Sequence, residues 1–393
     1  MGASVTRGEQ FRKSRAWLQT HTFVITKSLQ EKIESVPLDD REGYCYIQNQ
    51  VMVFAVEYER ESARIAATSW KDRLGTGYKR FITQLKEWNE LEVDADHRWS
   101  KNKSGYPMSY AIPLAAKESG TCIVDFKRKR IRLPRPKNKP SDAVSQYALE
   151  CLSKLKVAEN LVFPPPKKPT QNPNERRVRI KWHCEHIAGG DFSLHYGSKV
   201  KRLYHRVLSM PSEGRCNLTY WSPLAEYDVR TCHPFLMLKF FTNAQERSHY
   251  AEMLSGDIYT QIGREMKIDD RDQIKEDFQR ICNLRHKNAD WMAKQLVFQF
   301  YHQHFPNFAE QVIFQRKDLA VCLQNFEAAL MVQKLGNFCR DQNLFWIPMH
   351  DGFIARMDEG SVIAAQASKI ILDVVGLKPK IEIKPVNKTS SSS

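Results

Sequence analysis

The segment from residue 127 to 139, KRKRIRLPRPKNK, constrains the fold most strongly. It holds eight basic residues and no acidic residue. Prolines at positions 134, 136 and 140 exclude a regular helix there, because proline lacks the backbone N–H and clashes with the preceding turn. We therefore predict an extended connector over residues 126–145. It is either a plain interdomain linker or one that also follows a phosphate backbone through Lys127, Arg128, Lys129 and Arg130.

Length and charge limit what flanks this connector. The 393 residues suffice for two or three domains, and a net charge of +15 favours a polyanionic partner such as nucleic acid. A hydrophobic content of 42% excludes a disordered chain, and a mean hydropathy of −0.53 excludes a membrane bundle. Nine cysteines without a Cys-x-x-Cys pair indicate reduced thiols, so we expect a cytoplasmic protein with no membrane partner.

The region before the connector has a helix-and-hairpin pattern. Apolar residues recur at three-and-four spacing from residue 69 to 93, followed by short strands at 91–93 and 108–113 around a polar turn. This layout resembles the winged helix-turn-helix modules of phage and plasmid replication proteins, which implies a DNA-binding domain over residues 1–125. In such a module the helix enters the major groove and the wing contacts phosphates. The helix residues are Lys79, Arg80 and Lys86, and the wing residues are Arg98, Lys101 and Lys103. The alternative is a protein–protein platform.

Beyond the connector, two aspartates lie next to predicted strands. In the segment 224–230 a short apolar run leads into Asp228, and an apolar helical stretch follows at 234–240, so we expect Asp228 where a strand gives way to a helix. Asp351 follows His350 in a predicted β-hairpin over residues 344–355, whose two-residue turn we expect to be Asp351 and Gly352. A helix carrying Arg-x-x-x-Lys lies between these two motifs.

In this order, the motifs resemble the palm and fingers of family A nucleic-acid polymerases, over about 190 residues. The resemblance implies that Asp228 and Asp351 bind metal, with His350 beside them. It implies that Arg271 and Lys275 hold the incoming triphosphate. Tyr204, in a segment like the one that precedes the palm, and Gln324, in a helix like the one along the primer–template minor groove, would contact nucleic acid.

The chemistry accounts for these residue types. Nucleotidyl transfer needs two Mg²⁺ ions about 3.5–4 Å apart, held by carboxylates, and Mn²⁺ can substitute for them. Two aspartates from different strands are the minimum set of protein ligands. Arg271 and Lys275 are four residues apart, so they lie on one helix face and can neutralise phosphates together.

The sequence departs from the family at several positions. The DNA polymerases of the family usually have Glu five residues after the first Asp, where it blocks a ribose 2′-hydroxyl; this chain has His233. Gln279 replaces the aromatic residue four positions after the fingers lysine, although Phe278 is adjacent. His233 and Gln279 are therefore expected nucleotide-binding positions at which the choice between dNTP and NTP stays open.

A cluster at residues 182–186, WHCEH, offers candidate zinc ligands, with His195 nearby. No Cys-x-x-Cys pair completes a tetrahedral set, so we interpret it as polar loop residues.

Together these features predict an α+β protein with an N-terminal winged helix and a right-hand polymerase palm and fingers at residues 146–388. We expect a reduced or absent thumb, no exonuclease, and a disordered tail at 389–393. The predicted function is that of a DNA polymerase of a phage or mobile element, acting on primer–template or single-stranded DNA, with an accessory partner such as a helicase. The alternatives are a primase that uses ribonucleotides and a non-catalytic DNA-binding replication initiator.

Overall fold

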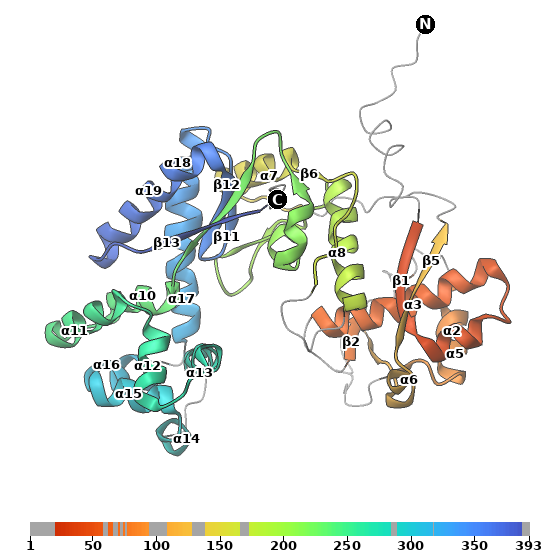
Figure 1. The fold of residues 1–393 in the computed structure, drawn as a ribbon, viewed down its shortest axis with the longest axis horizontal. Helices are drawn as coiled ribbons and strands as arrows, with labels where there is room; N and C mark the ends of the chain where they lie inside the picture. Colours follow the sequence, from red (N-terminus) through yellow and green to blue (C-terminus); the bar gives the residue numbers. More distant parts are fainter. Residues whose placement is uncertain are drawn as a thin grey trace, which may run out of the picture. The chain divides into compact units, whose positions relative to one another are not determined.

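The computed structural model describes residues 20–57, 62–65, 70, 74, 77–93, 108–127, 138–165, 173–283, 289–316 and 318–386. The chain divides into two compact units. Unit 1 comprises residues up to 134 together with 158–189 and 210–217, and unit 2 comprises 135–157, 190–209 and 218 onward. Both units combine helices with small antiparallel sheets, so the predicted α+β class is confirmed (Figure 1).

The unit boundary at 134/135 falls inside the connector predicted at 126–145. Residues 158–189 and 210–217 were expected in the domain at 146–388, yet they belong to unit 1. The reason is the helix α8 (Pro173–Ala188), which packs on β1 and α3 and contributes Val178 to the core of unit 1. Residues 128–137 and 387–393, which include much of the predicted connector and the predicted tail, lie outside the described residues.

Unit 1 contains two small sheets. Strands β1 (Thr20–Thr26) and β5 (Thr121–Lys127) pair antiparallel, and β4 (Met108–Ala111) lies between β2 (Ser62–Ile65) and β3 (Glu92–Val93). The strands predicted at 91–93 and 108–113 are thus present as β3 and β4, and β2 was not predicted. The helices are α2 (Lys27–Ile33), α3 (Leu38–Glu57), α5 (Tyr78–Glu87) and α6 (Leu114–Glu118).

The prediction for residues 69–93 was one helix or a helix pair broken at Gly75–Gly77. Residues 70 and 74 are helical, and α5 begins at Tyr78, after these glycines. Phe81 and Leu85, one turn apart, are buried, and the Phe81 ring packs edge-on against Tyr44 with 4.9 Å between centroids. The helix is therefore held by one apolar face.

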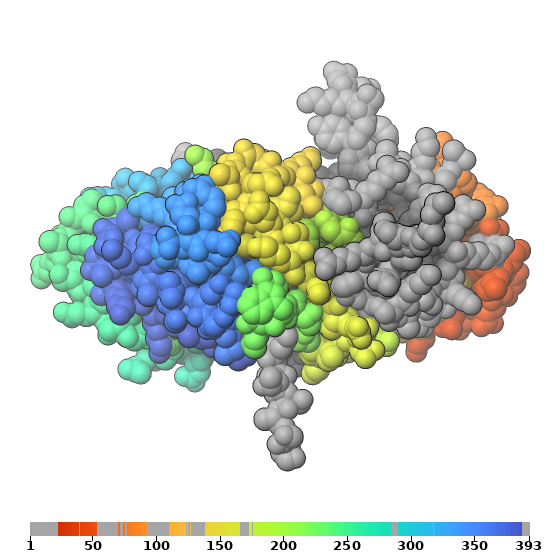
Figure 2. Space-filling view, turned by 90° about the horizontal axis from the view of Figure 1, so that it is seen from above, coloured from red at the N-terminus to blue at the C-terminus, as the bar shows by residue number. Residues whose placement is uncertain are grey.

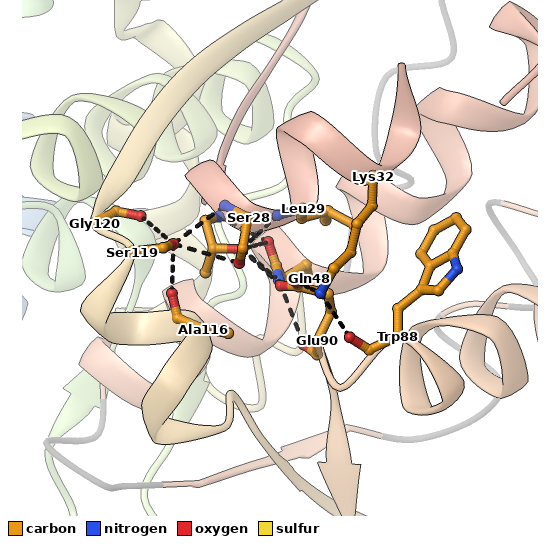
Figure 3. A network of polar contacts seen from close by, with 10 residues as sticks. Ser28, Leu29, Lys32, Gln48, Trp88, Glu90, Ala116, Ser119 and Gly120 are labelled. Atoms are coloured by element: carbon orange, nitrogen blue, oxygen red, sulfur yellow. Dashed lines mark hydrogen bonds and ion pairs between the residues drawn. The ribbon is translucent and has the colours of Figure 1, made fainter. Parts of the chain in front are cut away.

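A buried carboxylate joins the parts of unit 1 (Figure 3). Glu90 is 0% exposed, and its Oε2 accepts hydrogen bonds from the Thr26 hydroxyl at 2.7 Å and the Gln48 amide at 2.9 Å. Its Oε1 pairs with the Lys32 ammonium at 2.7 Å, and the same ammonium donates to the Trp88 carbonyl at 2.7 Å. Every partner comes from the chain itself, which is how a buried charge becomes tolerable.

Unit 2 is built around a four-stranded antiparallel sheet with the order β11-β12-β10-β13. The strands are β10 (Leu224–Val229), β11 (Trp346–Met349), β12 (Gly352–Arg356) and β13 (Ile381–Pro385). Short pairs of strands lie outside it: β6 (Lys156–Val157) with β9 (Leu218–Thr219), and β7 (His195–Tyr196) with β8 (Leu203–Tyr204). The first and last strands of the segment 224–385 thus lie side by side in the sheet, since β10 pairs with β13.

Helices surround this sheet (Figure 1). α7 (Ala143–Lys154), α18 (Leu335–Asp341) and α19 (Met357–Val375) contact its strands. A second group follows β10: α10 (Cys232–Met237), α11 (Ala244–Leu254), α12 (Ile258–Met266), α13 (Arg271–Asn283), α14 (Ala289–Ala293), α15 (Leu296–His304), α16 (Pro306–Phe308) and α17 (Leu319–Ala328). None of the helices within the described residues is both long and apolar enough to cross a membrane.

Segments distant in sequence meet on the surface of unit 2. Figure 2 shows the C-terminal residues in blue beside residues near 250 in green. The Arg247 guanidinium on α11 donates to the Val375 carbonyl at the end of α19 at 2.7 Å. This bond ties the helices after β10 to the C-terminal helix.

Candidate active site

The sheet of unit 2 brings the two predicted metal-binding aspartates together. β10 pairs antiparallel with β12, and Asp228 lies directly opposite Gly352. The Val229 N–H donates to the carbonyl oxygen of Asp351 at 3.0 Å. Opposed residues on paired strands have Cα atoms about 4.5–5.5 Å apart. Residues 123 positions apart in the chain, Asp228 and Asp351, therefore sit at one point of the sheet.

The hairpin is present, but its turn is one residue earlier than predicted. Met349 pairs with Gly352, so the two turn residues are His350 and Asp351. His350 adopts the left-handed conformation, with φ of 55°, which is uncommon for a residue with a side chain. Gly352 belongs to β12 instead. A Cβ there would collide with the Tyr227 carbonyl, so glycine is required by the close approach of β10, and the turn does not depend on it.

The two carboxylates disfavour each other's ionisation. Burial, followed by the negative charge of Asp228, raises the pKa of Asp351 to about 7. Burial also raises the pKa of Asp228, and the positive charge of the nearby Lys384 ammonium opposes this rise. The sequence thus produces a pair of acids whose combined negative charge is compensated only in part.

The last strand contributes two charged residues that the sequence analysis missed. Glu382 lies opposite Asp228 in the register of β13. The Lys384 Nζ is 3.6 Å from Asp228 Oδ2 and 3.4 Å from Glu382 Oε2. The alternation of apolar and charged residues in IEIK, at 381–384, is typical of a strand and could have predicted that Glu382 and Lys384 share one face.

The predicted triphosphate-binding residues lie on α13. Arg271 and Lys275 are both exposed, whereas Ile274 and Phe278 on the other face are buried. The Arg271 guanidinium pairs with Asp257 at 2.9 Å. Although burial raises the pKa of Asp228 overall, the positive charge of Lys275 is among the influences that oppose this rise.

His233, predicted at the sugar position, is part of a buried ion-pair cluster. Its Nε2 lies 3.0 Å from Glu327 Oε2 and 3.1 Å from Arg202, which pairs with the same Glu327 oxygen at 2.6 Å. Burial by itself would raise the pKa of Glu327. The hydrogen bond from His233 and the charge of Arg202 outweigh it, so the pKa of Glu327 is lowered. The His233 ring is therefore held by Glu327 on α17, a partner that the sequence did not indicate.

The other predicted residues of unit 2 divide into two groups. Tyr204 on β8 packs edge-on against His350, with 5.4 Å between ring centroids, so these two meet. Gln324 is half-buried on α17, and Gln279 is exposed on α13. Phe278, the aromatic residue next to Gln279 in the sequence, is 1% exposed and packs against Tyr259 and Tyr301. Its ring therefore belongs to the core.

The predicted DNA-binding residues of unit 1 are described only in part. Lys79, Arg80 and Lys86 are exposed on α5, and Arg80 pairs with Asp40. Lys127 ends β5, and nothing is described of its side chain. The others, Arg98, Lys101, Lys103, Arg128, Lys129 and Arg130, lie outside the described residues.

The WHCEH cluster is helical, which corrects the interpretation of these residues as a polar loop. His183, Cys184 and His186 lie on α8 and are buried, because this face of α8 packs into unit 1. Trp182 packs on both histidine rings, at 4.9 and 4.4 Å.

The donor set at Asp228 and Asp351 suits a hard divalent cation. Both are oxygen ligands, and a bound cation would relieve the repulsion that raises the pKa of Asp351. Among the described residues, no group of three or more His, Cys, Asp or Glu side chains is arranged to hold a metal. Mg²⁺ commonly takes one or two carboxylates and completes its shell with water and substrate phosphate, so two aspartates are a sufficient set.

The chain was also compared with known proteins. A scan against protein-family models and a search of curated protein sequences found no match. A function for this chain therefore has to be inferred from the geometry of the site.

Proposed function

We propose that this chain catalyses template-directed nucleotidyl transfer, as a DNA polymerase of the family A type. The observation that carries the proposal is the pairing of β10 with β12, which makes Asp228 and Asp351 neighbours although they are distant in sequence. In this interpretation the four-stranded sheet is the palm and the helices from α11 to α15 are the fingers, with little or no thumb and no exonuclease.

In this reaction a primer 3′-hydroxyl attacks the α-phosphate of a nucleoside triphosphate, and pyrophosphate leaves. Asp228 and Asp351 would hold two Mg²⁺ ions, or Mn²⁺ in their place, which when bound stabilise the attacking and leaving oxygens. The positive charge of Lys275 acts on Asp228, and this lysine would neutralise the phosphates. Tyr204 and His350 pack together next to Asp351 and would contact nucleic acid. His233, fixed by Glu327 and Arg202, would line the sugar position.

Unit 1 would bind DNA. The strand pair β3–β4 after the amphipathic helix α5 agrees with a winged helix, and Lys79 and Lys86 are exposed on that helix. A helix in the major groove contacts bases, while basic side chains at its edges contact phosphates. The net charge of +15 is in keeping with such a partner.

Primer extension on a defined template tests the proposal. The full chain is incubated with Mg²⁺ and either dNTPs or NTPs, and Asp351→Ala serves as the inactive variant. We expect extension by the wild type and none by Asp351→Ala. Incorporation of dNTPs alone identifies a DNA polymerase, and dinucleotide formation from NTPs without a primer identifies a primase.

Two results would contradict the proposal. Extension by Asp351→Ala at the wild-type rate would show that the metal site is wrong. Duplex binding by a wild type that incorporates no nucleotide would favour a replication initiator.

A further inference from the structure

Two arginines from different elements converge on one carboxylate beside the candidate active site. Arg230 follows β10, two residues after Asp228, and Arg271 begins α13. Both guanidiniums contact the same oxygen, Asp257 Oδ2, at 2.9 Å. The resemblance to family A polymerases assigned a role to Arg271 but none to Arg230.

Asp257 is fixed at both of its oxygens. Oδ1 caps the helix α12 by accepting from the N–H groups of Tyr259 at 3.0 Å and Thr260 at 3.2 Å. Partial burial by itself would raise the pKa of Asp257. The hydrogen bonds from Arg230 and Arg271 outweigh it, so the pKa of Asp257 is lowered. The side chain is thus an ionised anchor for both guanidiniums, and only 12% of it is exposed.

The cluster contains further charged groups. The two guanidiniums share the Asp257 carboxylate, and Lys275 lies one helical turn beyond Arg271. Two other acids lie at 3.8 Å, Glu382 from Arg230 Nε and the exposed Asp272 from Arg271 Nη1, and Lys384 in turn pairs with Glu382 at 3.4 Å. The Arg230 side chain is 31% exposed and that of Arg271 42%, so both present part of the guanidinium to solvent.

Two partly exposed guanidiniums held together suit a polyphosphate. A guanidinium has five N–H donors in a planar fork that matches phosphate oxygens, and a single carboxylate oxygen engages only some of them. Two guanidiniums held a fixed distance apart can contact two neighbouring phosphoryl groups without first paying the entropy of bringing them together.

We propose that Arg230 and Arg271 form a two-guanidinium receptor for the β- and γ-phosphates of the incoming nucleotide, with Asp257 as the residue that positions both. This inference rests on the proposed nucleotidyl transfer. Arg230 is then a substrate-binding residue, and Asp257 acts only through the arginines.

Binding of inorganic tripolyphosphate to the full chain tests the receptor without metal or catalysis. Isothermal titration calorimetry is run at low salt on the wild type, Arg230→Gln and Arg271→Gln. Each substitution should weaken binding about tenfold or more, as expected for loss of charge-assisted hydrogen bonds. The matched control is Arg280→Gln, which removes an exposed arginine paired with Asp277 at 2.9 Å on the same helix α13 and should leave affinity unchanged. Equal affinity of Arg230→Gln and wild type would overturn the inference.

Asp257→Asn tests the positioning role through the sign of its effect. Asparagine keeps the helix cap and removes one negative charge, so a purely electrostatic effect would strengthen anion binding. If Asp257 positions the arginines, tripolyphosphate should instead bind several-fold more weakly, about threefold or more, because the guanidiniums lose their shared anchor. Tighter binding by Asp257→Asn would overturn the positioning role.

Primer extension separates this inference from the proposed function. If the wild type extends primers, Arg230→Gln should raise the apparent KM for the nucleotide, and an unchanged KM would overturn the receptor. A wild type that binds tripolyphosphate through Arg230 but extends no primer would overturn the nucleotidyl transfer and leave a polyphosphate site in place.

Discussion

The two units of the molecule treat shielded carboxylates in opposite ways. In unit 1, Glu90 is 0% exposed, and Thr26, Gln48 and Lys32 all donate to it at 2.7–2.9 Å (Figure 3). In unit 2, Asp351 lies beside Asp228, a second acid, and its pKa is raised to about 7 by burial and by that charge.

The difference separates a structural acid from a proposed metal-binding one. Glu90 receives its compensation from the chain, so it cross-links α2, α3 and the end of α5 at little electrostatic cost. Asp228 and Asp351 are paired by the sheet although they repel, and such an arrangement persists only where the surrounding fold imposes it. The strain is what a bound divalent cation would relieve.

The largest expected effect comes from exchanging a charge in each region. Asp228→Asn should lower the primer-extension rate by about a thousandfold or more, since it removes a ligand whose contribution is largest in the transition state. Glu90→Gln should leave the rate of the folded protein within about threefold, because Glu90 makes only structural contacts. Steady-state extension assays on protein of matched folded fraction measure both. Comparable losses in the two variants would remove the distinction between the two acids.

The free energy of unfolding should depend strongly on Glu90, although the extension rate should not. Glu90→Ala leaves Thr26 and Gln48 buried without their acceptor, so unfolding should become easier by about 3 kcal/mol. Urea denaturation followed by circular dichroism measures this. The control is Glu87→Ala, at an exposed residue of α5 that accepts from Gln84, with an expected change of about 0.5 kcal/mol or less. A loss below 1 kcal/mol for Glu90→Ala would contradict the structural role.

A smaller and pH-dependent effect is expected at Asp351. Its folded pKa of about 7 exceeds the unfolded value of about 3.9, so the folded state binds the extra proton between these values. Wild-type stability should therefore fall as pH rises from about 4 to 7 and level off above. Asp351→Asn should be more stable than wild type by about 1–3 kcal/mol at pH 8.5, and this gain should vanish near pH 4.

Thermal denaturation across this pH range measures the difference between the two proteins. Added Mg²⁺ should stabilise the wild type at pH 8.5 and leave Asp351→Asn nearly unchanged. If the extra stability of Asp351→Asn over wild type instead grows as the pH falls, the pKa of Asp351 is lowered and the two aspartates do not repel.

The smallest effect is expected at Lys384. Its Nζ lies 3.6 Å from Asp228, but 58% of the side chain is exposed, so solvent screens the interaction. Lys384→Met should tighten apparent Mg²⁺ binding only about two- to fivefold, by removing a competing cation. Titration of Mg²⁺ by calorimetry measures it, and Lys378→Met, in the loop between α19 and β13, is the control. Weaker binding in Lys384→Met would indicate that Lys384 supports the site and does not compete with the cation.

Much of the local structure could be predicted from the sequence. The apolar run ending at Asp228 predicted β10, and the apolar residues around His350 and Asp351 predicted the β11–β12 hairpin. The turn itself was placed one residue late because Asp-Gly is a common turn dipeptide, whereas Gly352 is required by the Tyr227 carbonyl on a strand more than a hundred residues away.

The partners of the site residues could not be predicted. Nothing near His233 in the sequence indicates Glu327, and nothing near Asp228 indicates Lys384, because these contacts join segments 94 and 156 residues apart. The same holds for α8, whose residues 182–186 were interpreted as a loop and whose core partners are in β1 and α3. Local periodicity specifies an element and its buried face, but it does not specify which other element covers that face.

The sequence by itself determined the types of elements, the candidate acids and the basic character of the chain, because these depend on local spacing and composition. Only the tertiary structure decided that Asp228 meets Asp351, that Arg230 shares Asp257 with Arg271, and that Glu90 is neutralised within unit 1. Strand pairing and burial act between residues far apart in the chain, and they set the charge environment on which the chemistry depends.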